Sequence, residues 1–323
     1  MGQHHSDICV VGAGMAGLAC ATRLAEAGLI IDIIDKGRGP GGRMAARRTE
    51  IGGEVVSFDH GAQYFTARDG DFRAAVNEWQ SLGVVAPWQA AGDDAFVGIP
   101  GMNGPIRGMA QRLNVRWNTR AEALRRNDGE WHIDTGQNIF TAKTVLVAIP
   151  AEQAEVLLDE PAPEMAAVAA QARSEPCWAV MAGFAEALEI ESDTVRDPDG
   201  AISWAARNSA KPSRAGEECW VIHASADRSR ELLDHPKEEV GPILLDDFFD
   251  QTGAQCTVPI HLAAHRWLYS MAEPVEGEEA RFDHERSIGI AGDYLHSPRV
   301  EGAWLSGVAL AEKVLGPAQQ LVD

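Results

Sequence analysis

Asp7-Ile-Cys-Val-Val-Gly12-Ala-Gly14-Met-Ala-Gly17 lies near the N-terminus, and Asp35 follows it at the end of the next apolar run. The pattern predicts a buried strand over residues 8–11, a helix over 15–27 and a second strand over 30–34. A strand, a glycine-rich turn, a helix and a strand that ends in an acid form the βαβ layout typical of dinucleotide sites. The sequence therefore predicts a dinucleotide as ligand.

Each glycine of this turn has its own expected role. Gly12 makes the sharp turn, Gly14 lets a pyrophosphate approach the backbone, and Gly17 lets the helix pack closely on the strand. Asp35 would accept hydrogen bonds from ribose hydroxyls. The phosphate charge would be received by the helix dipole and the free amides of the first turn, those of Met15, Ala16 and Gly17.

Length and composition limit the class of protein. The chain has 323 residues, of which 45% are apolar, so two domains with full cores around one cleft are expected. It contains no run of about 18 apolar residues that could cross a membrane, and its first residues lack a signal-peptide pattern. A soluble cytoplasmic protein is expected.

Charge and metal-ligand spacing exclude further classes. The net charge of -20 disfavours nucleic acid and anionic membranes as partners, because such partners bind through neutralised phosphates. The five cysteines form no CxxC pair and the ten histidines no HxH or HExxH spacing, so no protein-bound metal is expected.

Two local groups of cations stand out in this acidic chain. Arg43, Arg47 and Arg48 form one group, and Arg207, Lys211 and Arg214 form the other. Each group could be a solvated basic face, or it could bind an anionic small molecule. We expect the second group to lie at an exposed mouth that holds such a substrate.

The chain divides by pattern into two discontinuous domains. The nucleotide-binding domain is predicted to comprise residues 1–70, 106–158 and 283–323, and the second domain residues 71–105 and 159–282. In the first domain, further strands are expected over residues 113–117, 121–126, 130–134, 145–149 and 288–291, with a helix over 305–315. In the second, strands are expected over 177–184, 201–207, 219–224 and 258–268, with a helix over 228–250.

Two segments far apart in the chain favour a flavin over a nicotinamide cofactor. Residues 36–44 form a glycine-rich crossing that could pass close to a large flat ligand, and Gly292-Asp293 follows a strand where the carboxylate could bind a ribityl hydroxyl. A helix start at Gly302-Ala303-Trp304 could direct its dipole toward the flavin N1 and C2 carbonyl. Taken singly, these segments could also be a flexible loop, a Gly-Asp turn and a packing helix.

At these residues the chain resembles the flavoproteins with two dinucleotide-binding domains that are related to amine oxidases, and among them the bacterial renalase-like proteins. The resemblance rests on the first motif with Asp35, on Gly41-Gly42-Arg43-Met44 and on Phe58-Asp-His-Gly-Ala-Gln-Tyr-Phe-Thr66. It also rests on His265-Arg266-Trp267 and on Gly292-Asp293 with Gly302-Ala-Trp-Leu-Ser-Gly307. Leu268 follows the triplet where many relatives carry a second basic residue.

The resemblance implies an α/β fold, with a glutathione-reductase-like FAD-binding Rossmann domain and a second, mixed-sheet substrate domain. It implies FAD held without a covalent bond. It also implies oxidation of reduced nicotinamide dinucleotides, the 2- or 6-dihydro isomers of NAD(P), by oxygen to give NAD(P)+ and hydrogen peroxide. The oligomeric state stays open.

Hydride transfer needs a donor carbon held against the flavin in a dry pocket, so positioning residues are expected to dominate the site. His265 and Trp267 should share one face of a strand, Asn208 could bind a carboxamide, and Tyr64 could line the pocket floor. Each has a plainer structural reading as a core or turn residue. The remaining residues expected at the cofactor are Lys36, Gly42, Arg43, Met44, His60, Gly61, Ala62, Gln63 and Ala121.

Three other functions stay open. An amine oxidase or desaturase acting on a small metabolite would need an aromatic cage, and the chain has only three tyrosines. A catalytically idle nucleotide sensor and a nicotinamide dehydrogenase without flavin are the other two.

Overall fold

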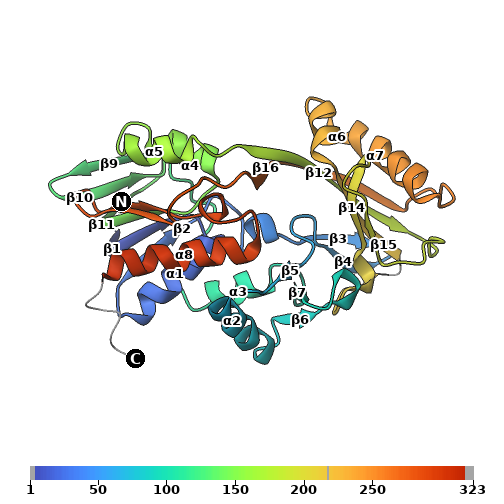
Figure 1. The fold of residues 1–323 in the computed structure, drawn as a ribbon, viewed down its shortest axis with the longest axis horizontal. Coiled ribbons are helices and arrows are strands. Elements are labelled where there is room, and N and C mark those ends of the chain that lie inside the picture. The colour runs from blue at the N-terminus through green and yellow to red at the C-terminus, as the bar shows by residue number, and fades with distance from the viewer. Residues whose placement is uncertain (1–3, 217, 317–323) are drawn as a thin grey trace. The chain divides into compact units, whose positions relative to one another are not determined.

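The computed structural model describes residues 4–216 and 218–316, which form two compact units (Figure 1). Unit 1 contains the described residues up to 42, residues 106–174 and the chain from 272 onward; unit 2 contains residues 43–105 and 175–271. Within the described ranges, no helix is both long enough and apolar enough to cross a bilayer. The two units are described in turn.

Unit 1 is built on a mixed eight-stranded sheet. Its strand order is β17-β18-β11-β1-β2-β8, and the hairpin β9-β10 joins it antiparallel to β11. The pairs β18-β11, β11-β1, β1-β2 and β2-β8 are parallel, and β17 is antiparallel to β18. The strands are β1 (His4–Val11), β2 (Ile31–Ile34), β8 (Val115–Arg116), β9 (Ala123–Asn127), β10 (Glu130–Asp134), β11 (Ile139–Val147), β17 (Arg281–Asp283) and β18 (Ile288–Ile290).

The helices of unit 1 come from distant parts of the chain. α1 (Met15–Glu26) and α8 (Val300–Leu315) lie side by side (Figure 1). A Cβ on Gly307 would lie 2.1 Å from the Ala16 carbonyl oxygen, so only glycine permits this contact. α4 (Ala151–Leu158) and α5 (Pro163–Ala169) pack in one core with Cys9 and Val145 of the sheet. α3 (Gly104–Ala110) spans the junction at residue 106.

Unit 2 contains a five-stranded sheet in the order β13-β14-β15-β12-β16. Trp178 and Trp220 on this sheet pack with Leu244 and Phe248 of α7 in a single apolar core. The elements are β12 (Ser174–Phe184), β13 (Thr194–Arg196), β14 (Ile202–Arg207), β15 (Glu218–Ala224), β16 (His261–Ala272), α6 (Ala226–Glu231) and α7 (Lys237–Thr252).

Two small sheets complete unit 2. The hairpin β3-β4 carries the arginines at 47 and 48, and β5-β7-β6 packs beside α2, whose N-terminus is capped by Asp69 through the amides of Asp71 and Phe72. These elements are β3 (Arg47–Ile51), β4 (Glu54–Phe58), β5 (Phe65–Thr66), β6 (Val85–Pro87), β7 (Ala95–Gly98) and α2 (Gly70–Ser81). Short 3-10 turns are η1 (Gly42–Met44), η2 (Gln89–Ala91), η3 (Asn208–Ala210) and η4 (Asp293–Leu295).

The α/β fold with a Rossmann-type domain and a mixed sheet agrees with the sequence prediction, but several boundaries differ. The single helix expected over 228–250 is two helices, because Pro236 has no N–H to continue a helix and is the extended N-cap of α7. The helix expected from 305 begins at Val300.

The division into units also differs from the expected domain boundaries. Residues 43–70 group with unit 2, whereas 159–174 and 272–282 group with unit 1. The contacts of these segments explain the difference. β3 and β4 form a two-stranded sheet of their own, whereas α5 packs in the core of unit 1 and β17 pairs with β18 of its sheet.

Candidate active site

The glycine-rich turn of unit 1 shows why each glycine is there. Gly12 has φ +107°, and a Cβ on it would lie 2.3 Å from the Ala148 oxygen. A Cβ on Gly17 would lie 1.9 Å from the Gly12 oxygen, so the helix could not pack against the turn. A Cβ on Gly14 would meet nothing within 4 Å. Packing therefore requires Gly12 and Gly17, whereas Gly14 leaves the backbone open to a ligand.

The N-terminus of α1 is available for an anion. Gly14 is the N-cap and provides no side-chain cap, and the first turn contains no acidic residue. The first amides of a helix lack partners within it, so those of Met15, Ala16 and Gly17 retain the positive end of the helix dipole. A phosphate group fits this position.

Asp35 ties the turn to the end of β2. Its carboxylate accepts hydrogen bonds from the amides of Ala13 (2.7 Å) and Gly37 (2.6 Å). A carboxylate has further lone pairs, so ribose hydroxyls could donate to it as well. Lys36 instead donates to Gln153 (2.7 Å), and burial, followed by the charge of Arg120, lowers the pKa of Lys36.

Three further residues expected at the cofactor lie in unit 1: Gly42, Ala121 and Asp293. A Cβ on Gly42 would lie 3.7 Å from the Gly14 Cα, and Ala121 is half-buried against the core. Asp293, 5% exposed, begins η4, and two residues separate it from the end of β18. The Gly292 amide donates to the Ser306 hydroxyl (2.9 Å), which fixes this corner to α8.

The helix start expected at Gly302-Ala303-Trp304 lies earlier, because α8 begins at Val300 and the Ala303 amide already donates to the Arg299 carbonyl oxygen (3.0 Å). The first turn has no side-chain cap and contains one acid, Glu301. A Cβ on Gly302 would lie 2.3 Å from the Ser297 oxygen, so glycine is needed for the close approach of residue 297. Unit 1 therefore offers two uncapped helix N-termini, an open glycine and an acid at the end of β2. These features fit a dinucleotide cofactor.

In unit 2, three aromatic side chains form what we call the ring cluster: His60, His265 and Trp267. Ring centroids lie 4.9 Å apart for the two histidines, 5.2 Å for His60 and Trp267, and 4.4 Å for His265 and Trp267. The Trp267 indole N–H donates to the His60 carbonyl oxygen (2.8 Å). His60 Nδ1 is buried and has no hydrogen-bond partner among the described residues, so a ligand could reach it only if the side chains that cover it move.

The two histidines of the ring cluster are neutral at neutral pH. Burial, followed by the nearby His265, lowers the pKa of His60 to about 4. Burial, followed by Arg47, also lowers the pKa of His265. Arg47 is exposed on β3, and it forms no ion pair with any side chain in the described part of the chain. The ring cluster is thus uncharged and lies in the positive potential of Arg47.

The turn that carries His60 is held by η1. The Arg43 carbonyl oxygen accepts from the Ala62 amide (2.8 Å), and a Cβ on Gly61 would lie 2.1 Å from the same oxygen. Met44 is buried beside it, and an Arg43 N–H donates to the Ser270 oxygen at 3.4 Å. The structure therefore brings Arg43, Met44, Gly61 and Ala62 together in unit 2.

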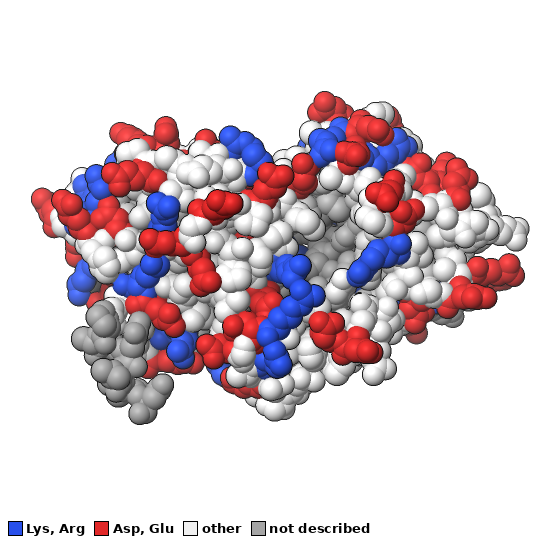
Figure 2. Space-filling view, in the orientation of Figure 1, with Lys and Arg blue, Asp and Glu red and all other residues white. Residues whose placement is uncertain are grey.

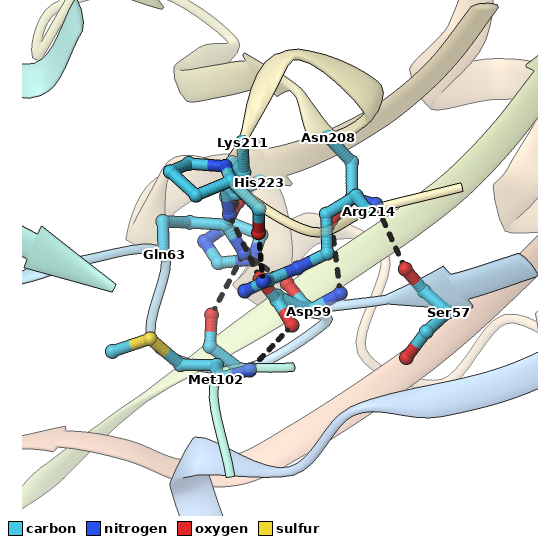
Figure 3. A network of polar contacts seen from close by, with 10 residues as sticks. Ser57, Asp59, Gln63, Met102, Asn208, Lys211, Arg214 and His223 are labelled. Atoms are coloured by element: carbon cyan, nitrogen blue, oxygen red, sulfur yellow. Dashed lines mark hydrogen bonds and ion pairs between the residues drawn. The ribbon is translucent and has the colours of Figure 1, made fainter. Parts of the chain in front are cut away.

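A buried polar network around Asp59 lies next to this turn (Figure 3). Asp59 accepts from the Met102 amide (2.8 Å), from Lys211 (3.3 Å) and twice from Arg214 (2.6 and 3.1 Å). Lys211 also donates to Gln63 Oε1 (3.0 Å). Sequence reasoning did not select Asp59, although a carboxylate inside an apolar string signals a buried ion pair.

The expectation of an exposed basic mouth at Arg207, Lys211 and Arg214 is wrong. The Lys211 and Arg214 side chains are 0% exposed and bind Asp59. Arg207 is paired with Asp193 and Glu218. Burial required partners for these cations, so they are not free to hold a substrate. Elsewhere, acidic side chains are spread among fewer basic ones over the visible face (Figure 2).

Asn208 and Tyr64 are also engaged within unit 2. Asn208 is 0% exposed; its amide donates to the Ser57 oxygen (2.8 Å) and accepts from the Asp59 amide (3.1 Å). That placement makes Asn208 a bridge between segments rather than a group facing a ligand. The Tyr64 hydroxyl accepts from Arg196 (2.6 Å), whose guanidinium stacks on Trp204.

Comparison with known proteins identifies the family. Residues 10–79 match the NAD(P)-binding Rossmann-like domain, and residues 80–315 match the flavin containing amine oxidoreductases. The chain belongs to the flavin containing amine oxidoreductase family. Its cofactor is FAD, bound non-covalently.

In the described ranges, no group of three or more His, Cys, Asp or Glu side chains is placed to hold a metal ion.

Solved structures with this fold differ in chemistry. A double mutant of putrescine oxidase has a TM-score of 0.73 at 14% identity, covering 97% of this chain and 100% of that one. Cyclohexylamine oxidase from Brevibacterium oxydans IH-35A has a TM-score of 0.62 at 12% identity (96% and 100% covered). A fatty acid isomerase from P. acnes has a TM-score of 0.70 at 12% identity (96% and 99% covered). Identities this low establish the fold alone.

Proposed function

We propose that this chain is an FAD-dependent oxidase that takes a hydride from a reduced nicotinamide dinucleotide, the 2- or 6-dihydro isomers of NAD(P). FAD, when bound, supplies the hydride acceptor and returns the two electrons to oxygen. The balanced reaction converts one dihydronicotinamide, one oxygen and one proton into NAD(P)+ and hydrogen peroxide.

The observation that carries this proposal is the charge at the ring cluster. Arg47 provides a positive potential at both histidines, and Asp59, which opposes it at His60, is itself paired with the buried Lys211 and Arg214. A cationic amine would be repelled, and an anionic dinucleotide would be attracted. The charge therefore favours a nucleotide substrate.

The shape and polarity of the ring cluster also suit a nicotinamide. His60, His265 and Trp267 provide flat, uncharged surfaces on which a neutral ring can pack. Hydride transfer of this kind needs positioning and a dry surface, and it needs no protein acid or base.

A screen of reductants tests the proposal. The purified holoenzyme is given oxygen with 2-, 4- or 6-dihydro-NAD(P), putrescine or cyclohexylamine, and peroxide is measured. Peroxide from the 2- or 6-dihydro nucleotides, with none from the amines, is the expected result. Peroxide from an amine and from none of the nucleotides would contradict the proposal.

Replacing Arg47 tests the observation itself. Arg47→Gln should raise KM for the nucleotide about tenfold with little change in kcat, because it removes attraction shared by ground and transition states. The matched control is Arg48→Gln, since Arg48 is also exposed and points to the other face of β3. Equal effects of the two substitutions would rule out a specific role for Arg47. Added salt should raise KM of the wild type more than that of Arg47→Gln.

The second candidate is an amine oxidase or desaturase acting on a small metabolite. Membership of the family and the two amine oxidases among the similar structures support it. An amine that loses its proton before binding would escape repulsion by Arg47. Peroxide formation from amines that rises with the neutral amine fraction would favour this candidate.

We also infer a glutathione-reductase-like arrangement for the FAD-binding part of the chain, in unit 1. Support comes from β18 and α8, which return near the C-terminus to the sheet and helix begun by β1 and α1. In this proposal Asp35 binds the adenosine ribose, the first turn of α1 binds the pyrophosphate, and Asp293 with the first turn of α8 binds the flavin end. The ring cluster of unit 2 binds the substrate.

A further inference from the structure

Lys211 is a buried cation that the proposed reaction does not use. It is 2% exposed, its ammonium lies 3.3 Å from Asp59 Oδ2 and 3.0 Å from Gln63 Oε1, and it lies 5.2 Å from the centre of the Trp88 ring. The charged or titratable groups that face it are Asp59, Arg214 and His223. Burial of a lysine needs a compensating role.

Neutralising Asp59 does not require Lys211. Arg214 donates twice to Asp59 Oδ2, at 2.6 and 3.1 Å, and the Met102 amide donates to Oδ1. The contact from Lys211 to Asp59 is the longest of these, and its shorter contact is with Gln63. Two cations therefore surround one carboxylate, and the lysine is directed mainly at the glutamine.

The ammonium on one side and two carbonyl oxygens on the other together determine which way the Gln63 amide faces. An ammonium only donates hydrogen bonds, so the amide must present Oε1 to it and Nε2 to the other side. There Nε2 donates to the carbonyl oxygens of Asp59 and Gly61, the latter at 3.0 Å, and it lies 3.4 Å from His223 Nε2. Gln63 thus clamps both sides of the turn that carries His60.

We propose that Lys211 is a positioning residue: through its hydrogen bond to Gln63 it fixes the turn from Asp59 to Gln63, and with it His60 of the ring cluster. The same turn is bonded to a second member of the ring cluster, because the Trp267 indole donates to the His60 carbonyl oxygen. A neutral amine would weaken the clamp, since it donates to Oε1 less strongly than an ammonium does, while the carbonyl oxygens of Asp59 and Gly61 still hold Nε2. What the ring cluster binds rests on the proposed function, but the clamp does not.

The clamp predicts a pH dependence in the alkaline range. Burial, opposed by Asp59 and reinforced by Arg214, lowers the pKa of Lys211 to about 8. Below this pH the ammonium donates strongly to Gln63 Oε1, and above it this hydrogen bond weakens and the amide is held less firmly. Arginine at this position would stay charged throughout and keep the clamp.

The test compares Lys211→Arg and Lys211→Met holoenzymes with wild type, and uses Lys237→Met as the control for loss of an exposed lysine. The first readout is the NMR signal of the Gln63 side-chain amide, assigned by its loss in Gln63→Glu. In wild type the signal should be protected from solvent exchange and change with a midpoint near pH 8. It should stay protected at all pH values in Lys211→Arg and lose protection at all pH values in Lys211→Met.

The second readout is turnover of the substrate found in the peroxide screen. Lys211→Met should lower kcat/KM about tenfold, with the FAD content unchanged. Above pH 8 the kcat/KM of the wild type should fall, and Lys211→Arg should keep most of its value there. A protected Gln63 amide in Lys211→Met would overturn the proposal. If the methionine variant does not fold, an amide in Lys211→Arg that keeps the wild-type midpoint would overturn it equally. Failure of every nucleotide in the peroxide screen would leave the NMR result intact, so the two proposals fail separately.

Discussion

At the scale of single residues, the local string from Phe58 to Thr66 was recognisable from the sequence, but its partners were not. Asp59 is bound by Lys211 and Arg214, which lie more than a hundred residues later. Spacing along one chain cannot reveal such a pairing; only the rule that buried charges need partners could have suggested it. The same limit led to the expectation that these cations face solvent.

The buried His60 and the half-buried His223 should make the protein sensitive to acid. Burial lowers the pKa of both His60 and His223 to about 4, below the usual 6.5. The unfolded state therefore binds more protons between pH 6.5 and 4, and the free energy of unfolding should fall across this window by up to about 3 kcal/mol per histidine. Urea titrations of the holoenzyme across this range measure the slope.

The variant His223→Gln removes one of the two contributions, so its curve should be flatter than that of wild type. His235→Gln is the matched control, since His235 is exposed beside Glu239. Parallel curves for wild type and His223→Gln would contradict the assignment.

At the scale of elements, helices and strands with strong apolar periodicity were predictable, and their ends were less so. α1 runs from Met15 to Glu26, close to the expected range, because Gly28 with φ +86° ends it. α8 begins five residues before its expected start, since no sequence signal marks Arg299 as an N-cap.

The glycine-rich turn allows two roles of glycine to be separated. Gly14→Ala should leave the stability of the apoprotein within about 0.5 kcal/mol of wild type, because its Cβ meets nothing and its φ of -81° suits alanine. The same Cβ would occupy the path of the pyrophosphate, so the Kd for FAD should rise at least tenfold, as roughly 1.4 kcal/mol of lost binding implies. Unchanged FAD affinity, measured by quenching of flavin fluorescence, would refute the assignment of this turn.

The contact between α1 and α8 predicts an unusual sign for a helical Gly→Ala substitution. Such a change normally stabilises a helix by about 0.5–1 kcal/mol, and Gly241→Ala in α7 should do so because its Cβ has room. Gly307→Ala should instead destabilise by about 1–3 kcal/mol, since its Cβ would overlap the Ala16 oxygen. Equilibrium unfolding of both variants gives the comparison; stabilisation by Gly307→Ala would show that the helices do not pack this closely.

At the scale of the whole molecule, the fold class could be predicted from the glycine-rich motif and from the C-terminal strand and helix. The boundaries of the two units could not. The chain leaves unit 1 after residue 42 and again after 174, and it returns at 106 and 272. A strand pattern does not state which sheet the strand will join, so β3, β4 and β17 could not be assigned from residues alone. The family membership is a property of the same scale, and it leaves the substrate to be found by measurement.

The most direct measurement of the central proposal is a single turnover without oxygen. Holoenzyme is mixed anaerobically in a stopped-flow instrument with 2- or 6-dihydro-NAD(P), with the 4-dihydro form or with putrescine, and the flavin absorbance is followed. Rapid bleaching by the 2- or 6-dihydro nucleotides, one equivalent of NAD(P)+ formed and return of colour in air are the predicted results. Bleaching by the amine, with none of the nucleotides reacting, would contradict the account.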